Sequence, residues 1–146
     1  MKRLPLVYVA GPFRGPTSWA VEQNVRRAEE LSLLVWEAGA ACICPHANTR
    51  FFQGEAADSV WLDGDLEIMR RCDAVVLTPG WPFSNGALAE KAEAERLGIP
   101  VFDTVFALRV WIAAKKTELD SEDTVFRAFA EAMAAKQTTP DEIPFP

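Results

Sequence analysis

The feature that most constrains the fold is a series of short, continuous apolar segments that alternate with stretches of helical periodicity. The apolar segments cover residues 6–10, 40–44, 74–77 and 99–102, and the helical patterns cover 17–38, 58–71 and 85–97. Continuous apolar runs of this length are typical of strands that are buried on both faces, as in a parallel sheet. The alternation therefore predicts a parallel sheet whose right-handed crossover helices cover both faces.

Two further helical patterns follow the last apolar segment, at 105–116 and 121–136. The tail 138–146 contains three prolines and is expected to be extended. A chain of 146 residues is the usual size of one domain. We therefore predict a single α/β domain over residues 1–137, built as a three-layer sandwich with a parallel sheet of four to five strands and extra C-terminal helices.

Charge and hydropathy limit the partners that this chain can have. The net charge of -6 argues against a nucleic-acid polymer as the main partner, although a few local donors can still hold a single nucleotide. No apolar run reaches the ~18 residues of a membrane span. The segment after Met1 lacks a signal-peptide core, so a cytoplasmic protein is expected.

The three cysteines lie in apolar contexts, and we expect them to be reduced. Cys42, Cys44 and the nearby His46 are too few for the four ligands of a structural zinc site. No metal site is therefore predicted.

The third apolar segment leads into the most informative part of the chain. A loop rich in proline and glycine covers 78–83, and Ser84 then has the character of a helix N-cap. Ligands of open α/β sheets bind beyond the carboxyl ends of the strands, and the free N–H groups of a helix N-terminus suit an anion. The sequence therefore predicts an anion site around Ser84, Asn85 and Gly86.

Two carboxylates have positions that a purely structural role explains poorly. Glu90 lies on the small-residue side of the helix 85–97, and Asp65 lies on the apolar side of the helix 58–71. An exposed helix glutamate is the alternative for Glu90, and a structural aspartate that caps a loop or pairs with an arginine is the alternative for Asp65. A carboxylate on a buried stripe needs a partner, because burying it alone costs several kcal/mol or raises its pKa.

Several short motifs, taken in order, resemble the nucleoside 2-deoxyribosyltransferase superfamily, in particular its nucleotide N-hydrolase-like and uncharacterised bacterial and phage members. The motifs are Val7-Tyr8 with Gly11 and Arg14-Gly15, then Asp65-Leu66, then residues 72–76, and then Ser84 with Gly86 and Glu90. The resemblance covers roughly residues 6–101. It implies a flavodoxin- or Rossmann-like fold, no cofactor, and a homodimer or larger assembly.

The resemblance also implies roles for individual residues. Glu90 matches the nucleophile that attacks the anomeric carbon, and Asp65 matches an aspartate that holds the sugar and supports proton transfer to the leaving base. Tyr8 matches a tyrosine that hydrogen-bonds near the nucleophile. Ser84 and the donors near Arg14 and Gly15 match the residues that hold a 5′-phosphate, which favours a nucleoside monophosphate as substrate. A surface salt bridge is the alternative for Arg14.

We expect further substrate contacts from the loops at the same edge of the sheet. These residues are Gly11, Phe13, His46, Trp81, Asn85 and Gly86. His46 follows a strand end and can contact the base or hydrogen-bond its own loop, and Trp81 with Phe83 can stack on a base or pack in a core or dimer.

The predicted activity is cleavage or transfer of an N-glycosidic bond with release of a free base. A module of the same fold that binds or senses nucleotides without turnover is the alternative. An electron carrier is disfavoured, because no Thr/Ser-rich phosphate loop follows the first strand. The apolar residues of 102–112, and Phe126, Phe129 and Met133, exceed what one small sheet can cover and predict a homodimer.

Overall fold

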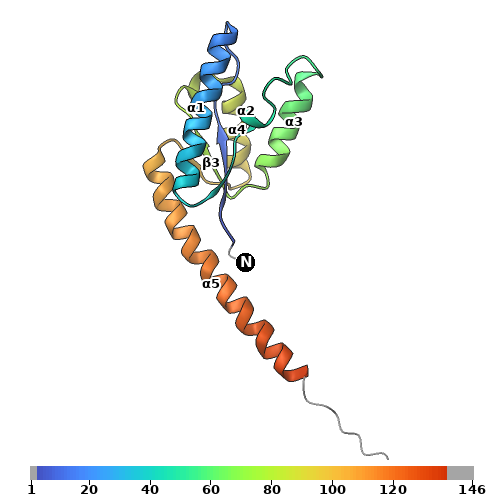
Figure 1. Ribbon diagram of the computed structural model, residues 1–146, viewed down its shortest axis with the longest axis vertical. Helices are drawn as coiled ribbons and strands as arrows, with labels where there is room; N and C mark the ends of the chain where they lie inside the picture. Colours follow the sequence, from blue (N-terminus) through green and yellow to red (C-terminus); the bar gives the residue numbers. More distant parts are fainter. Residues whose placement is uncertain (1–2, 138–146) are drawn as a thin grey trace, which may run out of the picture.

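The sheet of this protein has four parallel strands, seen in a computed structural model that describes residues 3–137 (Figure 1). The strands are β1 (Leu6–Ala10), β2 (Ala41–Ile43), β3 (Ala74–Leu77) and β4 (Val101–Phe102), in the spatial order β2-β1-β3-β4. Tyr8 of β1 pairs with Ile43 on one side and with Val75 on the other. This is the strand order of flavodoxin-like folds, so the predicted fold class is confirmed.

The helices lie on both faces of this sheet. They are α1 (Ser18–Glu37), α2 (Pro45–Asn48), α3 (Asp58–Met69), α4 (Asn85–Arg96) and α5 (Val105–Gln137), with a 3-10 turn, η1 (Trp81–Phe83), before α4. Val7 and Val9 pack with α1 and α5, whereas Tyr8 and Ala10 pack with α3 and α4. Successive side chains of a strand point to opposite faces, so both faces of β1 are buried and the molecule has three layers.

Local signals in the sequence place the helix ends. The Thr17 hydroxyl accepts a hydrogen bond from the Ala20 N–H at 3.1 Å, and the Ser84 hydroxyl accepts one from the Ala87 N–H at 3.2 Å. Gly39, with φ of 87°, follows α1 in the left-handed conformation that ends many helices. The predicted N-cap of Ser84 is therefore confirmed.

The topological switch point lies between β1 and β3, because the chain leaves these two central strands toward opposite edges of the sheet. Gly11 follows β1 and Thr78 follows β3. A Cβ atom on Gly11 would lie 1.8 Å from Thr78 Oγ1, so only glycine allows the two strand ends to come this close. Gly11 and Thr78 therefore form the base of any site at the carboxyl ends of these strands.

Four sequence predictions about secondary structure need correction. The strands β2 and β4 are shorter than the apolar segments 40–44 and 99–102. The loop predicted after residue 44 begins instead with the short helix α2, whose first residue is Pro45. Proline is favoured at this position, because its fixed φ suits a helix and its missing N–H is not needed there.

The largest correction concerns α5, which is one helix where two were predicted. No glycine or proline lies between 116 and 121, so nothing in the sequence breaks the helix there. Its first half packs on the sheet through Leu108 and Ile112, each 1% exposed. Its second half projects away from the sheet (Figure 1).

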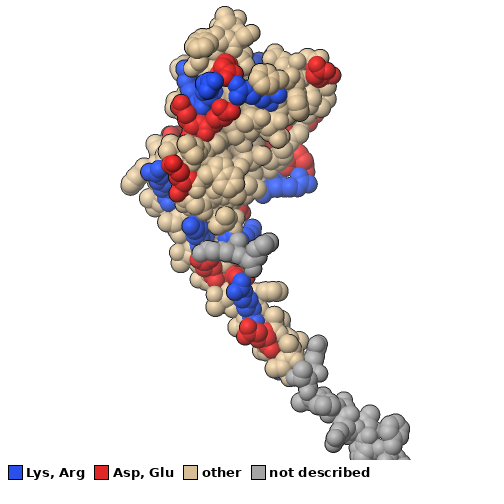
Figure 2. All heavy atoms as spheres, viewed as in Figure 1, with Lys and Arg blue, Asp and Glu red and all other residues tan. Residues whose placement is uncertain are grey.

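The surface shows no gathering of one charge on the face seen in Figure 2, where acidic and basic side chains are interspersed. Among residues 3–137 no helix is long and apolar enough to cross a membrane. Within the same range the three cysteines are free, and no cluster of side chains could hold a metal ion. The extended tail predicted for 138–146 lies outside the described residues.

Candidate active site

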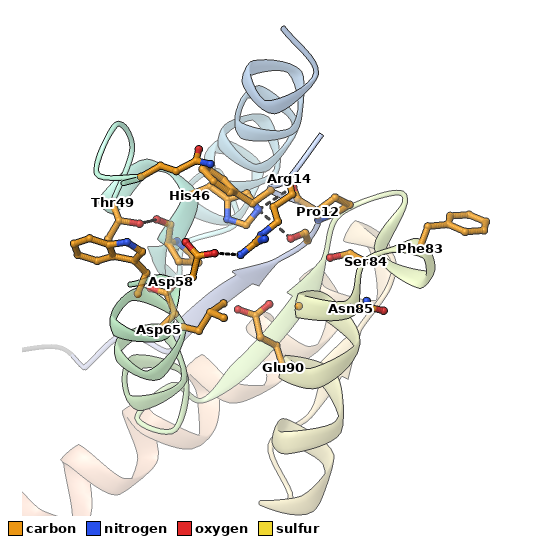
Figure 3. Close-up of a pocket in the computed structure, with 17 residues that line it drawn as sticks. Pro12, Arg14, His46, Thr49, Asp58, Asp65, Phe83, Ser84, Asn85 and Glu90 are labelled. Atoms are coloured by element: carbon orange, nitrogen blue, oxygen red, sulfur yellow. Dashed lines mark hydrogen bonds and ion pairs between the residues drawn. The ribbon is translucent and has the colours of Figure 1, made fainter. Parts of the chain in front are cut away.

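A cavity of about 490 Å³ opens at the carboxyl ends of the central strands, over the switch point. Its walls come from the loop after β1 (residues 11–14), from α2 and the loop that follows it, from one face of α3, and from residues 83–86 and 90 at the start of α4. Glu90 and Asp65 approach this cavity from α4 and α3 (Figure 3). The elements therefore place the two unexplained carboxylates in one site.

Tyr8 of the central strand β1 holds the Glu90 side chain in place. The Tyr8 hydroxyl donates a hydrogen bond to Glu90 Oε1 at 2.6 Å, and the Tyr8 side chain is fully buried. Burial and the Glu90 charge both raise the pKa of Tyr8, so its hydroxyl stays protonated and acts as a donor. This bond fixes one oxygen of Glu90 and leaves the other for a ligand.

Burial changes the acidity of both carboxylates. It raises the pKa of Glu90 to about 7, an effect that the Tyr8 hydrogen bond opposes and that the Asp65 charge reinforces. Burial also raises the pKa of Asp65 to about 6, and no hydrogen bond offsets it within residues 3–137. Two interacting carboxylates with raised pKa values share a proton near neutral pH.

The predicted anion site lies between the start of α4 and Arg14. Ser84, Asn85 and Gly86 line the cavity where the free N–H groups of α4 begin. The Arg14 guanidinium forms an ion pair with the Asp58 carboxylate across the cavity mouth (Figure 3). Both sides of this anion site therefore face the same space.

His46 holds the loop that follows β1. It is 8% exposed, and its Nε2 lies 3.0 Å from both the Gly11 and the Pro12 carbonyl oxygens. Burial lowers the pKa of His46, although the two carbonyl hydrogen bonds oppose this effect. Phe13 packs edge-on against the imidazole, with ring centroids 5.4 Å apart. A neutral His46 therefore donates to its loop, which is the alternative left open by the sequence, while it also lines the cavity.

The structure brings most of the sequence-predicted site residues together. Those that line the cavity are Gly11, Phe13, Arg14, His46, Asp65, Ser84, Asn85, Gly86 and Glu90. Tyr8 lies beneath Glu90. Gly15 and Trp81 lie outside the lining: a Cβ on Gly15 would lie 2.6 Å from the Ala20 Cβ, and Trp81 packs with the buried residues of the α3 and α4 side. Phe83 borders the cavity, but its side chain is 94% exposed and its ring points away from the other lining residues (Figure 3).

Sequence analysis missed the rest of the α3 wall. Asp58, Trp61 and Leu62 line the cavity beside Asp65. Their spacing of three, four and seven residues places them on one helical face, which was the available signal. The sequence assigned Trp61 and Leu62 to a buried stripe, but Leu62 is 50% exposed because this face borders a cavity and not a core. The buried Trp61 Nε1 has no hydrogen-bond partner among the described residues.

Comparisons with known proteins bear on family and fold. A family model described as "Domain of unknown function (DUF7768)" matches residues 5–104, which include the whole sheet and the cavity. No curated protein matches the chain. Among solved structures, a 2-deoxyribosyltransferase from the psychrotolerant bacterium Bacillus psychrosaccharolyticus is similar, with a TM-score of 0.50 and 17% identity. The match covers 66% of this chain and 69% of that one, and it shows a shared fold.

Proposed function

The chain belongs to the family described as domain of unknown function DUF7768, and within it we propose that this protein cleaves the N-glycosidic bond of a nucleoside 5′-monophosphate and releases the free base. The observation that carries the proposal is the half-buried Glu90, oriented by Tyr8 and lining one cavity with Asp65.

The chemistry of this bond suits two carboxylates. Departure of the base leaves positive charge on the anomeric carbon, as in glycoside hydrolysis. The free oxygen of Glu90 attacks that carbon, forming a glycosyl ester as the bond to the base nitrogen breaks. Asp65, when protonated, gives its proton to the departing base. Water then releases the sugar phosphate, or another base accepts it, so the acceptor decides between hydrolase and transferase.

The acidity of the pair determines how much of it is in the reactive form near neutral pH. A pKa of about 7 for Glu90 and about 6 for Asp65 leaves one proton on the pair across that range. Because Glu90 has the higher pKa, this proton resides mainly on Glu90, and the reaction proceeds from the minor arrangement in which Glu90 is ionised and Asp65 is protonated.

The preference for a 5′-monophosphate rests on the start of α4 and on Arg14. Ser84, Asn85 and Gly86 border the cavity at a helix N-terminus, where anions bind favourably. Arg14 faces the same space and presents a guanidinium that matches phosphate geometry. The solved 2-deoxyribosyltransferase is described as a catalyst of nucleoside synthesis, which is consistent with sugar-base chemistry in this fold.

A panel of ribo- and deoxyribonucleoside monophosphates tests the proposal, with free base measured by chromatography. We expect base release by the wild-type protein, and a loss of about a thousandfold or more in Glu90→Gln, which keeps the volume but removes the nucleophile. Glu95→Gln is the matched control, because Glu95 is an exposed residue of the same helix, paired with Lys91.

The outcomes separate the candidate functions. Retention of more than about a tenth of the turnover in Glu90→Gln would contradict the mechanism. Tight binding of a monophosphate with no base release by the wild-type protein would favour the binding or sensing module instead.

A further inference from the structure

The charges around the cavity are unevenly distributed. Four charged side chains line it: the Arg14 guanidinium and the carboxylates of Asp58, Asp65 and Glu90. Arg14 is thus the only cation in the wall formed by the described residues. An incoming phosphate meets two carboxylates deeper in the cavity, so its binding depends on the charge that Arg14 can offer.

Arg14 already has an ion-pair partner. Its guanidinium pairs with the carboxylate of Asp58, the first residue of α3, so the ion pair joins the loop after β1 to the opposite wall (Figure 3). The two side chains are 73% and 52% exposed. An exposed ion pair of this kind contributes little free energy, typically below ~1 kcal/mol, because water and salt screen it. A better anion can therefore displace it.

We propose that Asp58 is a specificity-determining residue, whose carboxylate pairs with Arg14 and is exchanged for the phosphate ester of the substrate. This inference rests on the proposed function and adds a residue to it. A phosphate carries up to two negative charges against one for the carboxylate, and it offers more acceptor oxygens to the guanidinium. Dianionic phosphate esters therefore displace the Asp58 carboxylate from Arg14, whereas singly charged anions do not.

The exchange lowers phosphate affinity in two ways. The Arg14–Asp58 pair must be broken before Arg14 reaches the phosphate, and the released carboxylate of Asp58 then remains near the bound anion. Removing the Asp58 charge relieves both costs. Neutral ligands do not compete for Arg14, so their affinity is independent of Asp58.

Calorimetry with ribose 5-phosphate and ribose tests this inference without any glycosidic bond to cleave. In Asp58→Asn at low ionic strength, we expect ribose 5-phosphate to bind about three- to tenfold more tightly, with ribose unchanged. The gain should shrink at high salt and disappear in the Arg14→Gln background. Asp63→Asn is the matched control, since Asp63 is an exposed residue of α3 outside the cavity lining.

Three results would overturn the inference: no change in ribose 5-phosphate affinity in Asp58→Asn, an equal change for ribose, or a gain that persists without Arg14. Failure of both proteins to bind ribose 5-phosphate would overturn it as well. Circular dichroism of Asp58→Asn verifies that α3 remains folded. Because ribose 5-phosphate carries no base, these results are independent of whether the protein releases bases from nucleotides.

Discussion

At the scale of single residues, the contact between Tyr8 and Glu90 determines what the site can do. A glutamate on the cavity side of α4 has two carboxylate oxygens to satisfy, and the Tyr8 hydroxyl satisfies one of them at 2.6 Å. The remaining oxygen faces the cavity. The residue therefore has a fixed orientation, which a flexible surface glutamate lacks, and a fixed orientation lowers the entropic cost of attack on a bound sugar.

The raised pKa values predict a bell-shaped dependence of kcat on pH. The reaction needs an ionised Glu90 and a protonated Asp65, so the active form is the pair that carries one proton. With a pKa of about 7 for Glu90 and about 6 for Asp65, the singly protonated pair is most abundant between these values, and the active arrangement is a constant minor fraction of it. We expect a maximum of kcat in that interval, measured at saturating nucleotide, with apparent pKa values that belong to the pair.

Asp65→Asn provides the control for this pH dependence. It should lower kcat and leave a profile that only rises with pH, because the acid has been removed. Its midpoint should lie below 7, since the Asp65 charge contributes to the raised pKa of Glu90. An unchanged bell-shaped dependence of kcat on pH in Asp65→Asn would show that another group supplies the proton.

Asp65 and Glu90 could be identified from the sequence, because each is a charged residue on the apolar or small-residue side of its helix. It could not indicate which residues face them across the cavity. Arg14 and Asp58 are 44 residues apart, and their pairing depends on how far the loop after β1 reaches over α3. Trp81 was expected to contact the substrate, but the η1 turn directs it toward the α3 and α4 side of the core.

At the scale of elements, the start of α4 combines two roles that Ser84→Ala can separate. Ser84 caps the helix through the Ala87 N–H, and it also lines the cavity. Loss of the cap should cost about 1 kcal/mol in the free energy of unfolding. If Ser84 also contacts phosphate, a nucleoside monophosphate should lose more affinity than the corresponding nucleoside.

Thr104→Ala is the matched control for Ser84→Ala. The Thr104 hydroxyl accepts a hydrogen bond from the Ala107 N–H at 3.2 Å at the start of α5, where it caps a helix and does not line the cavity. Denaturant unfolding should give similar losses of stability for both variants, while calorimetry should find weaker monophosphate binding in Ser84→Ala alone. Equal effects of Ser84→Ala on the nucleotide and the nucleoside would remove the phosphate role.

The element that the sequence described least well is α5. Its two apolar stripes were treated as separate helices, because each has helical spacing and a polar segment lies between them. Helical periodicity does not reveal whether two helices are continuous. Continuity follows from the absence of a breaker, and from hydroxyl groups such as those of Thr117 and Ser121 that bond to carbonyls one turn earlier without interrupting the helix.

At the scale of the whole molecule, the order of the strands was largely accessible from the sequence. Continuous apolar runs predict the strands β1 and β3. Because crossover connections are right-handed, few strand orders are then possible. The position of the cavity followed, because the carboxyl ends of β1 and β3 meet at the switch point. The direction of the projecting half of α5 did not follow, because helical periodicity does not determine where a helix points.

That projecting half predicts self-association. Val125, Phe126, Phe129 and Met133 are 70, 69, 63 and 44% exposed and form one apolar stripe. Such a stripe on an unsupported helix is costly in water, and a second copy offers a matching surface by two-fold symmetry. We expect a homodimer in sedimentation at micromolar concentration, and a shift toward monomer in Phe129→Lys. Trp19→Ser removes an apolar side chain from α1 that is 73% exposed and should leave the mass unchanged. A monomeric wild-type protein would contradict the prediction.

The hydrogen bond between Tyr8 and Glu90 has a further consequence for the kinetics of folding. It joins residues 82 positions apart in the chain, so it forms only once β1 and α4 have been brought together. Contacts of such long sequence separation form slowly, because the entropy of closing the loop is lost before the contact forms. During refolding, the fluorescence of the aromatic residues in the core should therefore return before base release returns, or at the same time. Base release that returns before this fluorescence would contradict the expectation.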